Sequence, residues 1–140
     1  FDFKELYNKT VFMQLNQGYR TKEYAVPVKR YCQTLSLKNN PELIAEYRKI
    51  HSRENAWPEI RKGIRSVGIL DMEIYISGSL LFMIVDTPLD FDWDSAMERL
   101  SHLPRQAEWE DCVARFQECA PGSTSSQKWK LMERMFYLYD

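Results

Sequence analysis

The stretch that decides the fold is ILDMEIYISGSLLFMIV, residues 69–85. Its first half alternates apolar and polar side chains with the period of two that is typical of a β-strand. Ser77-Gly78-Ser79 is a tight turn, and the chain returns as an unbroken apolar run over residues 80–85. We therefore predict a β-hairpin whose second strand is covered on both faces and lies in the middle of a sheet.

Two further strands are predicted, one on each side of the hairpin in the sequence. Residues 31–37 alternate, and residues 129–139 alternate well enough for a final strand, which follows a mobile loop at residues 120–126. One face of the first of these strands would hold Tyr31, Gln33, Leu35 and Leu37.

Helices are predicted between the strands. Asn40 suits an N-cap and is followed by proline, so a helix should run over residues 41–53, with a second helical piece over residues 58–67. After the hairpin, helical spacing of large apolar residues predicts helices over residues 92–103 and 105–119.

The resulting order is strand, helix, strand, strand, helix, strand, which is the ferredoxin-like split βαβ pattern of the α+β class. The helices would cover one face of an antiparallel sheet. Both faces of the strand at residues 80–85 are apolar, so the second face needs a partner. We expect a homodimer packed sheet to sheet, as in dimeric α+β barrels, or a pocket closed by such a dimer.

The first 28 residues are predicted to form an N-terminal arm, and residues 29–140 the main domain. Thr10 to Leu15 has the β-branched and aromatic content of a short extra strand, which could pair with a sheet edge or with a partner subunit. A disordered leader is the alternative.

Composition excludes several classes of function. The chain has 140 residues, a formal net charge of −1 and interspersed charges, which argues against a nucleic-acid or membrane surface. No apolar run is long enough to span a membrane, and no signal peptide is visible. The three cysteines, Cys32, Cys112 and Cys119, lack metal-ligand spacing, so we expect reduced thiols, no metal and a cytoplasmic protein.

One pair of residues indicates chemistry. Tyr47 and His51 are four apart, so on a helix they lie on one face, where a titratable ring beside a phenol could transfer a proton. A single histidine on an apolar face is more often structural, and that alternative stays open. The sequence contains no phosphate-binding loop, nucleophile elbow or metal cluster.

Several short motifs occur in a meaningful order. They are Tyr47-x-x-x-His51, Trp57-Pro58-Glu59, the hairpin ending in Leu81-Phe82, then Trp109, and Phe136-Tyr137-Leu138. Together they resemble the L-rhamnose mutarotase family over residues 29–139. No single motif is specific, and the match depends on their order and spacing.

The resemblance implies a dimeric ferredoxin-like enzyme without metal or cofactor that interconverts the α and β anomers of a monosaccharide. By the family pattern, His51 is the proton donor, and Tyr47 and Trp109 contact the sugar. The acid role suits histidine, because its pKa lies near the working pH.

The chain departs from the family pattern at the expected pocket. Met72 stands where a tyrosine is expected, Glu108 replaces the first tryptophan of a Trp-Trp pair, and the loop before Trp57 is two residues longer. Glu108 is a candidate base or hydroxyl acceptor, or a solvated charge. Trp57 either contacts the sugar or anchors the break between two helices. The sugar could therefore be L-rhamnose, L-fucose or another 6-deoxy sugar.

Two other functions fit the same sequence. One is a cofactor-free monooxygenase or decarboxylase on this scaffold, which would need a larger and almost wholly apolar pocket. The other is a sugar-binding module without catalysis. The leading hypothesis is a sugar mutarotase, an isomerase that uses His51.

Overall fold

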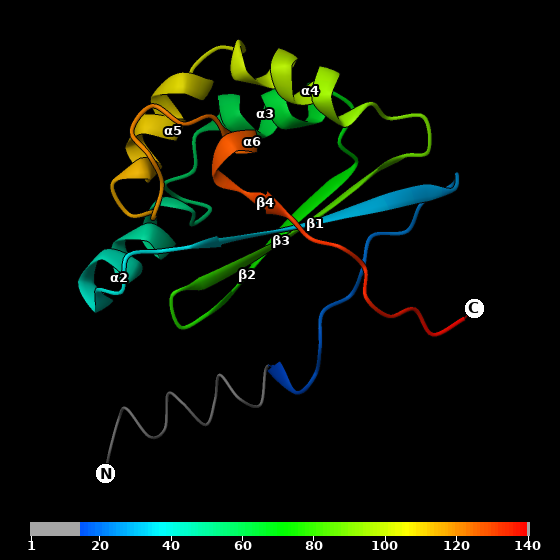
Figure 1. Ribbon diagram of the computed structural model, residues 1–140, viewed down its shortest axis with the longest axis horizontal. Coiled ribbons are helices and arrows are strands. Elements are labelled where there is room, and N and C mark those ends of the chain that lie inside the picture. Colours follow the sequence, from blue (N-terminus) through cyan, green and yellow to red (C-terminus); the bar gives the residue numbers. More distant parts are fainter. Residues whose placement is uncertain (1–14, 140) are drawn as a thin grey trace.

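A four-stranded antiparallel sheet with strand order β2-β3-β1-β4 carries the helices α2 to α6 on one side (Figure 1). The computed structural model describes residues 15–139. The architecture is the predicted α+β class, with an antiparallel sheet and helices on one face. In chain order the elements are β1 (Val28–Ser36), α2 (Pro41–Ile50), α3 (Pro58–Ser66), β2 (Asp71–Ser77), β3 (Leu80–Pro88), α4 (Trp93–Ser101), α5 (Gln106–Ala114), α6 (Ser125–Lys128) and β4 (Lys130–Leu131).

The predicted hairpin is present and β3 is central, paired with β2 on one side and β1 on the other. Gly78 makes the turn with φ of 60°, a left-handed conformation that glycine adopts without steric cost. Side chains of β3 alternate between a face covered by helices and an open face. Leu81, Met83 and Val85 are buried on the covered face, whereas Leu80, Phe82 and Ile84 lie on the open face.

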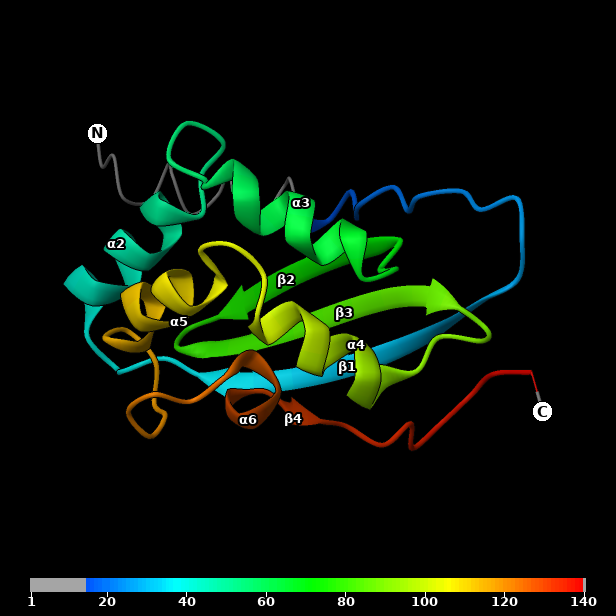
Figure 2. The ribbon, with the colours of Figure 1, turned by 90° about the horizontal axis from the view of Figure 1, so that it is seen from above.

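Seen from the helix side, α3 and α4 run along the sheet, whereas α2 and α5 lie at the end of the sheet near the β2–β3 turn (Figure 2). The N-cap of α2 is Asn40, as predicted, and its side chain accepts hydrogen bonds from the backbone of Glu42 and Leu43. The helix ends at Ile50, not at residue 53 as predicted. The reason is local, because the Ser52 hydroxyl bonds the carbonyl of Lys49 and turns follow.

The helix α5 also ends earlier than predicted, at Ala114. The next residues leave the helix to pair with the end of β1. The Lys38 amide donates to the Phe116 carbonyl at 2.8 Å, and the Glu118 amide donates to the Ser36 carbonyl at 2.9 Å. Tertiary pairing overrides the local helical pattern here.

The C-terminal segment corrects two predictions. The loop expected at residues 120–126 contains the start of the short helix α6, which Thr124 begins with a capping box. The strand expected over residues 129–139 is only Lys130–Leu131. Beyond it, no described part of the chain covers the side chains, so alternation alone does not give a strand. Exposed residues of this tail include Met135, Phe136, Tyr137, Leu138 and Tyr139.

The described part of the arm crosses the sheet on the side opposite the helices (Figure 1). Tyr24 donates to Asp86 at 2.8 Å, and the ring of Tyr19 lies 5.6 Å from that of Tyr75. The strand expected at Thr10 to Leu15 lies outside the described residues except for Leu15. Within residues 15–27 no strand forms.

Among residues 15–139, no helix has the length and apolar character needed to cross a membrane.

Candidate active site

A cavity of about 600 Å³ lies between the helices and the covered face of the sheet. Five of the six predicted site residues line it, and they come from three helical segments and one strand. These five are Tyr47, His51, Trp57, Met72 and Trp109. The cavity therefore joins residues that are 62 positions apart in the sequence, from Tyr47 to Trp109 (109 − 47).

Tyr47 and His51 meet as their spacing on α2 predicts. Their ring centroids are 4.3 Å apart, and Tyr47 is only 4% exposed. His51 is the C-cap residue of α2, and its Nδ1 lies 2.7 Å from the backbone carbonyl oxygen of Tyr47. A carbonyl oxygen only accepts hydrogen bonds, so Nδ1 carries a hydrogen and Nε2 is the ring nitrogen available to a ligand.

The environment of His51 favours the neutral imidazole. Burial lowers its pKa below the ordinary value of 6.5, and the positive charge of Arg61 lowers it further. The hydrogen bond to the Tyr47 carbonyl raises the pKa, but less than burial lowers it. At neutral pH the ring is therefore uncharged, with a lone pair on Nε2.

Two tryptophans continue the wall beside His51. The ring of Trp109 on α5 lies 5.1 Å from that of His51, edge to face, and Trp57 lies 5.2 Å from Trp109. Trp57 is the N-cap residue of α3, and the guanidinium of Arg105 lies 4.0 Å from the centre of its ring. Trp57 thus both anchors the break between the helices and lines the cavity.

The structure does not bring Glu108 into the cavity. Its side chain is 65% exposed and lies 3.5 Å from Arg105 on the surface of α5. The second histidine of the sequence, His102, is the C-cap residue of α4, where it is exposed and pairs with Glu98 at 2.8 Å. Two acidic residues on β2, Asp71 and Glu73, share the open face of the sheet opposite Asp86 and Ile84. Asp71 is also among the residues that line the cavity, whereas Glu73 accepts a hydrogen bond from Tyr75.

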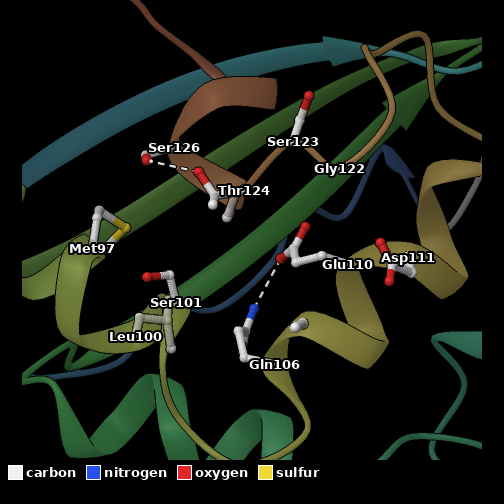
Figure 3. Close-up of a pocket in the computed structure, with 12 residues that line it drawn as sticks. Met97, Leu100, Ser101, Gln106, Glu110, Asp111, Gly122, Ser123, Thr124 and Ser126 are labelled. Atoms are coloured by element: carbon white, nitrogen blue, oxygen red, sulfur yellow. Dashed lines mark hydrogen bonds between the residues drawn. The ribbon is translucent and has the colours of Figure 1, made fainter.

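Sequence reasoning missed a buried ion pair at the edge of the cavity. The Lys128 side chain is fully buried, and its Nζ lies 2.7 Å from Glu110 Oε2. Gln106 donates to the other oxygen of Glu110 at 2.8 Å. Figure 3 shows the hydrogen bond between Gln106 and Glu110 on α5. Both residues line a smaller hollow of about 80 Å³, together with Gly122, Ser123 and Thr124 of the segment before α6. Gln106 and Glu110 are four residues apart on one helix, and this spacing is the one feature of the local sequence that indicates their contact.

Two more buried glutamines line the cavity and were not predicted as site residues. Gln33 occupies an inward position of β1, where the alternating pattern calls for an apolar side chain. A polar residue at such a position could have identified Gln33 as a site residue from the sequence. Gln117 follows α5 and donates to the hydroxyl of Tyr47 at 3.3 Å. Nothing near Gln117 in the sequence marks it as a site residue.

Within residues 15–139, no group of His, Cys, Asp and Glu side chains could hold a metal ion.

The sequence pattern of the L-rhamnose mutarotase family matches residues 30–138. The chain belongs to the L-rhamnose mutarotase family. It is 34% identical over 111 residues to an L-fucose mutarotase of Xanthomonas campestris, covering 79% of this chain and 89% of that protein. It is also 34% identical over 113 residues to a UPF0734 protein of Dictyostelium discoideum, covering 80% and 89%.

A solved structure agrees with the fold. The L-rhamnose mutarotase of Formosa agariphila superposes with a TM-score of 0.59 at 20% identity, covering 79% of this chain and 98% of that one. The predicted ferredoxin-like α+β fold is therefore confirmed. Mutarotases of this family are isomerases that act on sugar anomers, and the predicted enzyme class is confirmed with the family.

Proposed function

We propose that this cavity interconverts the α and β anomers of a 6-deoxy sugar of the L-rhamnose or L-fucose type. The observation that carries the proposal is the fixed orientation of His51. Its Nδ1 is bonded to its own helix, which leaves Nε2 for the sugar in a cavity walled by tryptophan rings. The names of the similar proteins support the sugar class, since L-rhamnose and L-fucose are both 6-deoxy sugars.

His51 would move one proton in each direction of the reaction. In ring opening, Nε2 accepts the proton of the anomeric hydroxyl, the C1–O5 bond breaks, and a carbonyl forms at C1. The resulting imidazolium donates the same proton to O5, so His51 is the predicted proton donor in the second half of the step. Ring closure on either face of the carbonyl reverses these transfers and gives either anomer.

Other residues of the cavity would hold the sugar. The flat apolar faces of Trp109 and Trp57 suit the C–H face of a pyranose ring. Met72 lies on β2 opposite Val85, on the covered face of the sheet, and offers apolar contact for a methyl group at C6. Glu108 would have to move from the surface to serve as the base, so we leave that role to His51.

A homodimer and a reducing compartment are part of the proposal. Phe82 and Ile84 stay partly exposed on the open face of β3, which supports packing of this face against a second copy. Residues 29–140 would form the catalytic domain, with residues 1–28 as its arm.

Cys32, Cys112 and Cys119 are all free thiols, which supports a cytoplasmic location.

The test is anomer exchange of L-fucose and L-rhamnose, measured by saturation-transfer NMR. The wild type should accelerate exchange of at least one of the two sugars. His51→Ala should lower the rate by about 10²- to 10⁴-fold, the usual contribution of a general acid–base residue, without loss of the fold. His102→Ala is the matched control, because the only other histidine of the chain is exposed on α4. Sugar binding without exchange in the wild type would instead indicate a binding module.

A further inference from the structure

We propose that Gln117 is a positioning residue of this site, one that turns the phenol of Tyr47 into a hydrogen-bond donor aimed at the sugar. This inference rests on the proposed function. In this role, Gln117 determines whether the Tyr47 hydroxyl can donate its hydrogen to a sugar oxygen. It thereby sets the affinity with which that oxygen is bound next to His51.

In the hydrogen bond between Gln117 and Tyr47, the amide is the donor and the phenol is the acceptor. Gln117 Nε2 donates to Tyr47 Oη at 3.3 Å, and both residues are buried, with exposures of 2% and 4%. A phenol has one hydrogen to donate besides its lone pairs. Since the bond from Gln117 uses a lone pair, the hydrogen of Tyr47 remains free for an acceptor in the cavity that both residues line. Burial raises the pKa of Tyr47 to about 12, which keeps that hydrogen in place at neutral pH.

The other end of the amide argues against a purely structural role. Gln117 Oε1 is buried and has no hydrogen-bond partner among the described residues. A buried carbonyl oxygen without a partner destabilises a fold, and an apolar side chain would fill the same space without that cost. Its neighbours Phe116 and Leu37 are apolar and 1% exposed. A glutamine here therefore serves something other than packing.

The backbone holds Gln117 firmly in place. The residue forms an antiparallel bridge with Leu37, and its amide donates to the Ala114 carbonyl at 3.1 Å. The flanking residues Phe116 and Glu118 are bonded to the end of β1 on both sides. A side chain that starts from such a fixed point can orient a partner with little loss of freedom when the sugar binds.

The connection continues from Tyr47 to His51. The hydroxyl of Tyr47 contacts Gln117, and the backbone carbonyl of the same residue fixes Nδ1 of His51. Glu110 cannot replace Gln117 in this role, because a carboxylate has no hydrogen to donate to the phenol. Its two oxygens instead accept hydrogen bonds from Gln106 (Figure 3) and Lys128.

The experiment replaces Gln117 with methionine, an unbranched side chain of similar size that cannot donate to the phenol. We measure kcat/KM for anomer exchange by NMR and stability by urea unfolding. Gln117→Met should lower kcat/KM about tenfold, the usual effect of one lost hydrogen bond to a substrate-binding group, with unchanged or greater stability. Gln17→Met, at an exposed position of the arm, is the matched control and should change neither quantity.

A double-mutant cycle with Tyr47→Phe then separates positioning from structure. If Gln117 acts through the phenol, Gln117→Met lowers kcat/KM no further once the hydroxyl is gone. Independent losses that multiply, or Gln117→Met with lower stability and unchanged kcat/KM, would overturn the inference while the mutarotase proposal stands. A wild type that accelerates no exchange would overturn the mutarotase proposal itself.

Discussion

The two faces of one sheet differ in what they bury, although their apolar content is similar. Along β3, Leu81, Met83 and Val85 face the helices, and Leu80, Phe82 and Ile84 face the other way. The covered face also encloses polar groups, among them Gln117 and the ion pair of Lys128 with Glu110. On the open face, the Asp86 side chain is only 6% exposed, but its partner Arg30 is 50% exposed, so this ion pair reaches the solvent. Buried polar groups that line a cavity, and not apolar character alone, therefore identify the face that carries the chemistry.

The largest effect should come from the covered face. Lys128→Met leaves the carboxylate of Glu110 buried without its cation and should cost about 3–5 kcal/mol of unfolding free energy. Urea unfolding measures the loss. Lys130→Met, two residues on and exposed, is the matched control and should be close to neutral.

Removing both charges gives a sharper form of the same test. Lys128→Met combined with Glu110→Gln should recover most of the lost stability, because no unpaired charge remains in the interior. If the single Lys128→Met variant is as stable as the wild type, water reaches Glu110. The ion pairs of the two faces would then not differ in burial, which would contradict the comparison.

On the open face, the expected effect is on assembly. Ile84→Glu places a charge in the middle of the apolar surface that we propose to be the dimer interface, and should weaken the dimer roughly 100-fold. Size-exclusion chromatography with light scattering measures the mass. Leu89→Glu, an exposed leucine beyond the end of β3, should remain dimeric. A wild type that stays monomeric at high concentration would remove the interface from the proposal.

The charged pair of the open face should contribute least. Asp86 accepts hydrogen bonds from Arg30, which lower its pKa more than burial raises it, with a further bond from Tyr24. A carboxylate with a lowered pKa stabilises the fold above its ordinary pKa, and that contribution is lost as the pH falls through the lowered value. Asp86→Asn should cost about 1 kcal/mol at pH 7, because Arg30 is half exposed.

The same variant should narrow the difference in stability between pH 7 and pH 3, as measured by urea unfolding at the two values. Asp90→Asn, at an exposed position after β3, supplies the comparison. An Asp86→Asn variant with the full pH dependence of the wild type would show that this carboxylate is not the group responsible.

The fold could be predicted from the sequence where a pattern repeats locally. Alternation gave the hairpin, and the spacing of Tyr47 and His51 gave their contact, because both depend on a single element. The C-terminal strand shows the limit of this reasoning. Its pattern continues to Tyr139, but the strand ends at Leu131, and only the Met132 amide beyond it still donates to β1, at the Cys32 carbonyl. Strand formation depends on the partner as much as on the segment itself.

The site could be predicted only in part for the same reason. Gln117 lies 70 residues from Tyr47, and Lys128 lies 18 residues from Glu110. Such contacts form when distant elements meet in the folded chain, and no local spacing indicates them. Glu108 shows the converse, because its neighbour Trp109 turns into the cavity while Glu108 points to solvent on the same helix.

The central claim is that a neutral His51 moves the proton on the covered face, and the pH dependence of kcat/KM for anomer exchange tests it most directly. Burial and Arg61 lower the pKa of His51, and only the neutral ring has a lone pair on Nε2. Activity should therefore rise with pH through an inflection below 6.5 and then level off, with no such inflection in the residual activity of His51→Ala. A rate that falls as the pH rises through this range, or that keeps the inflection without His51, would contradict the account.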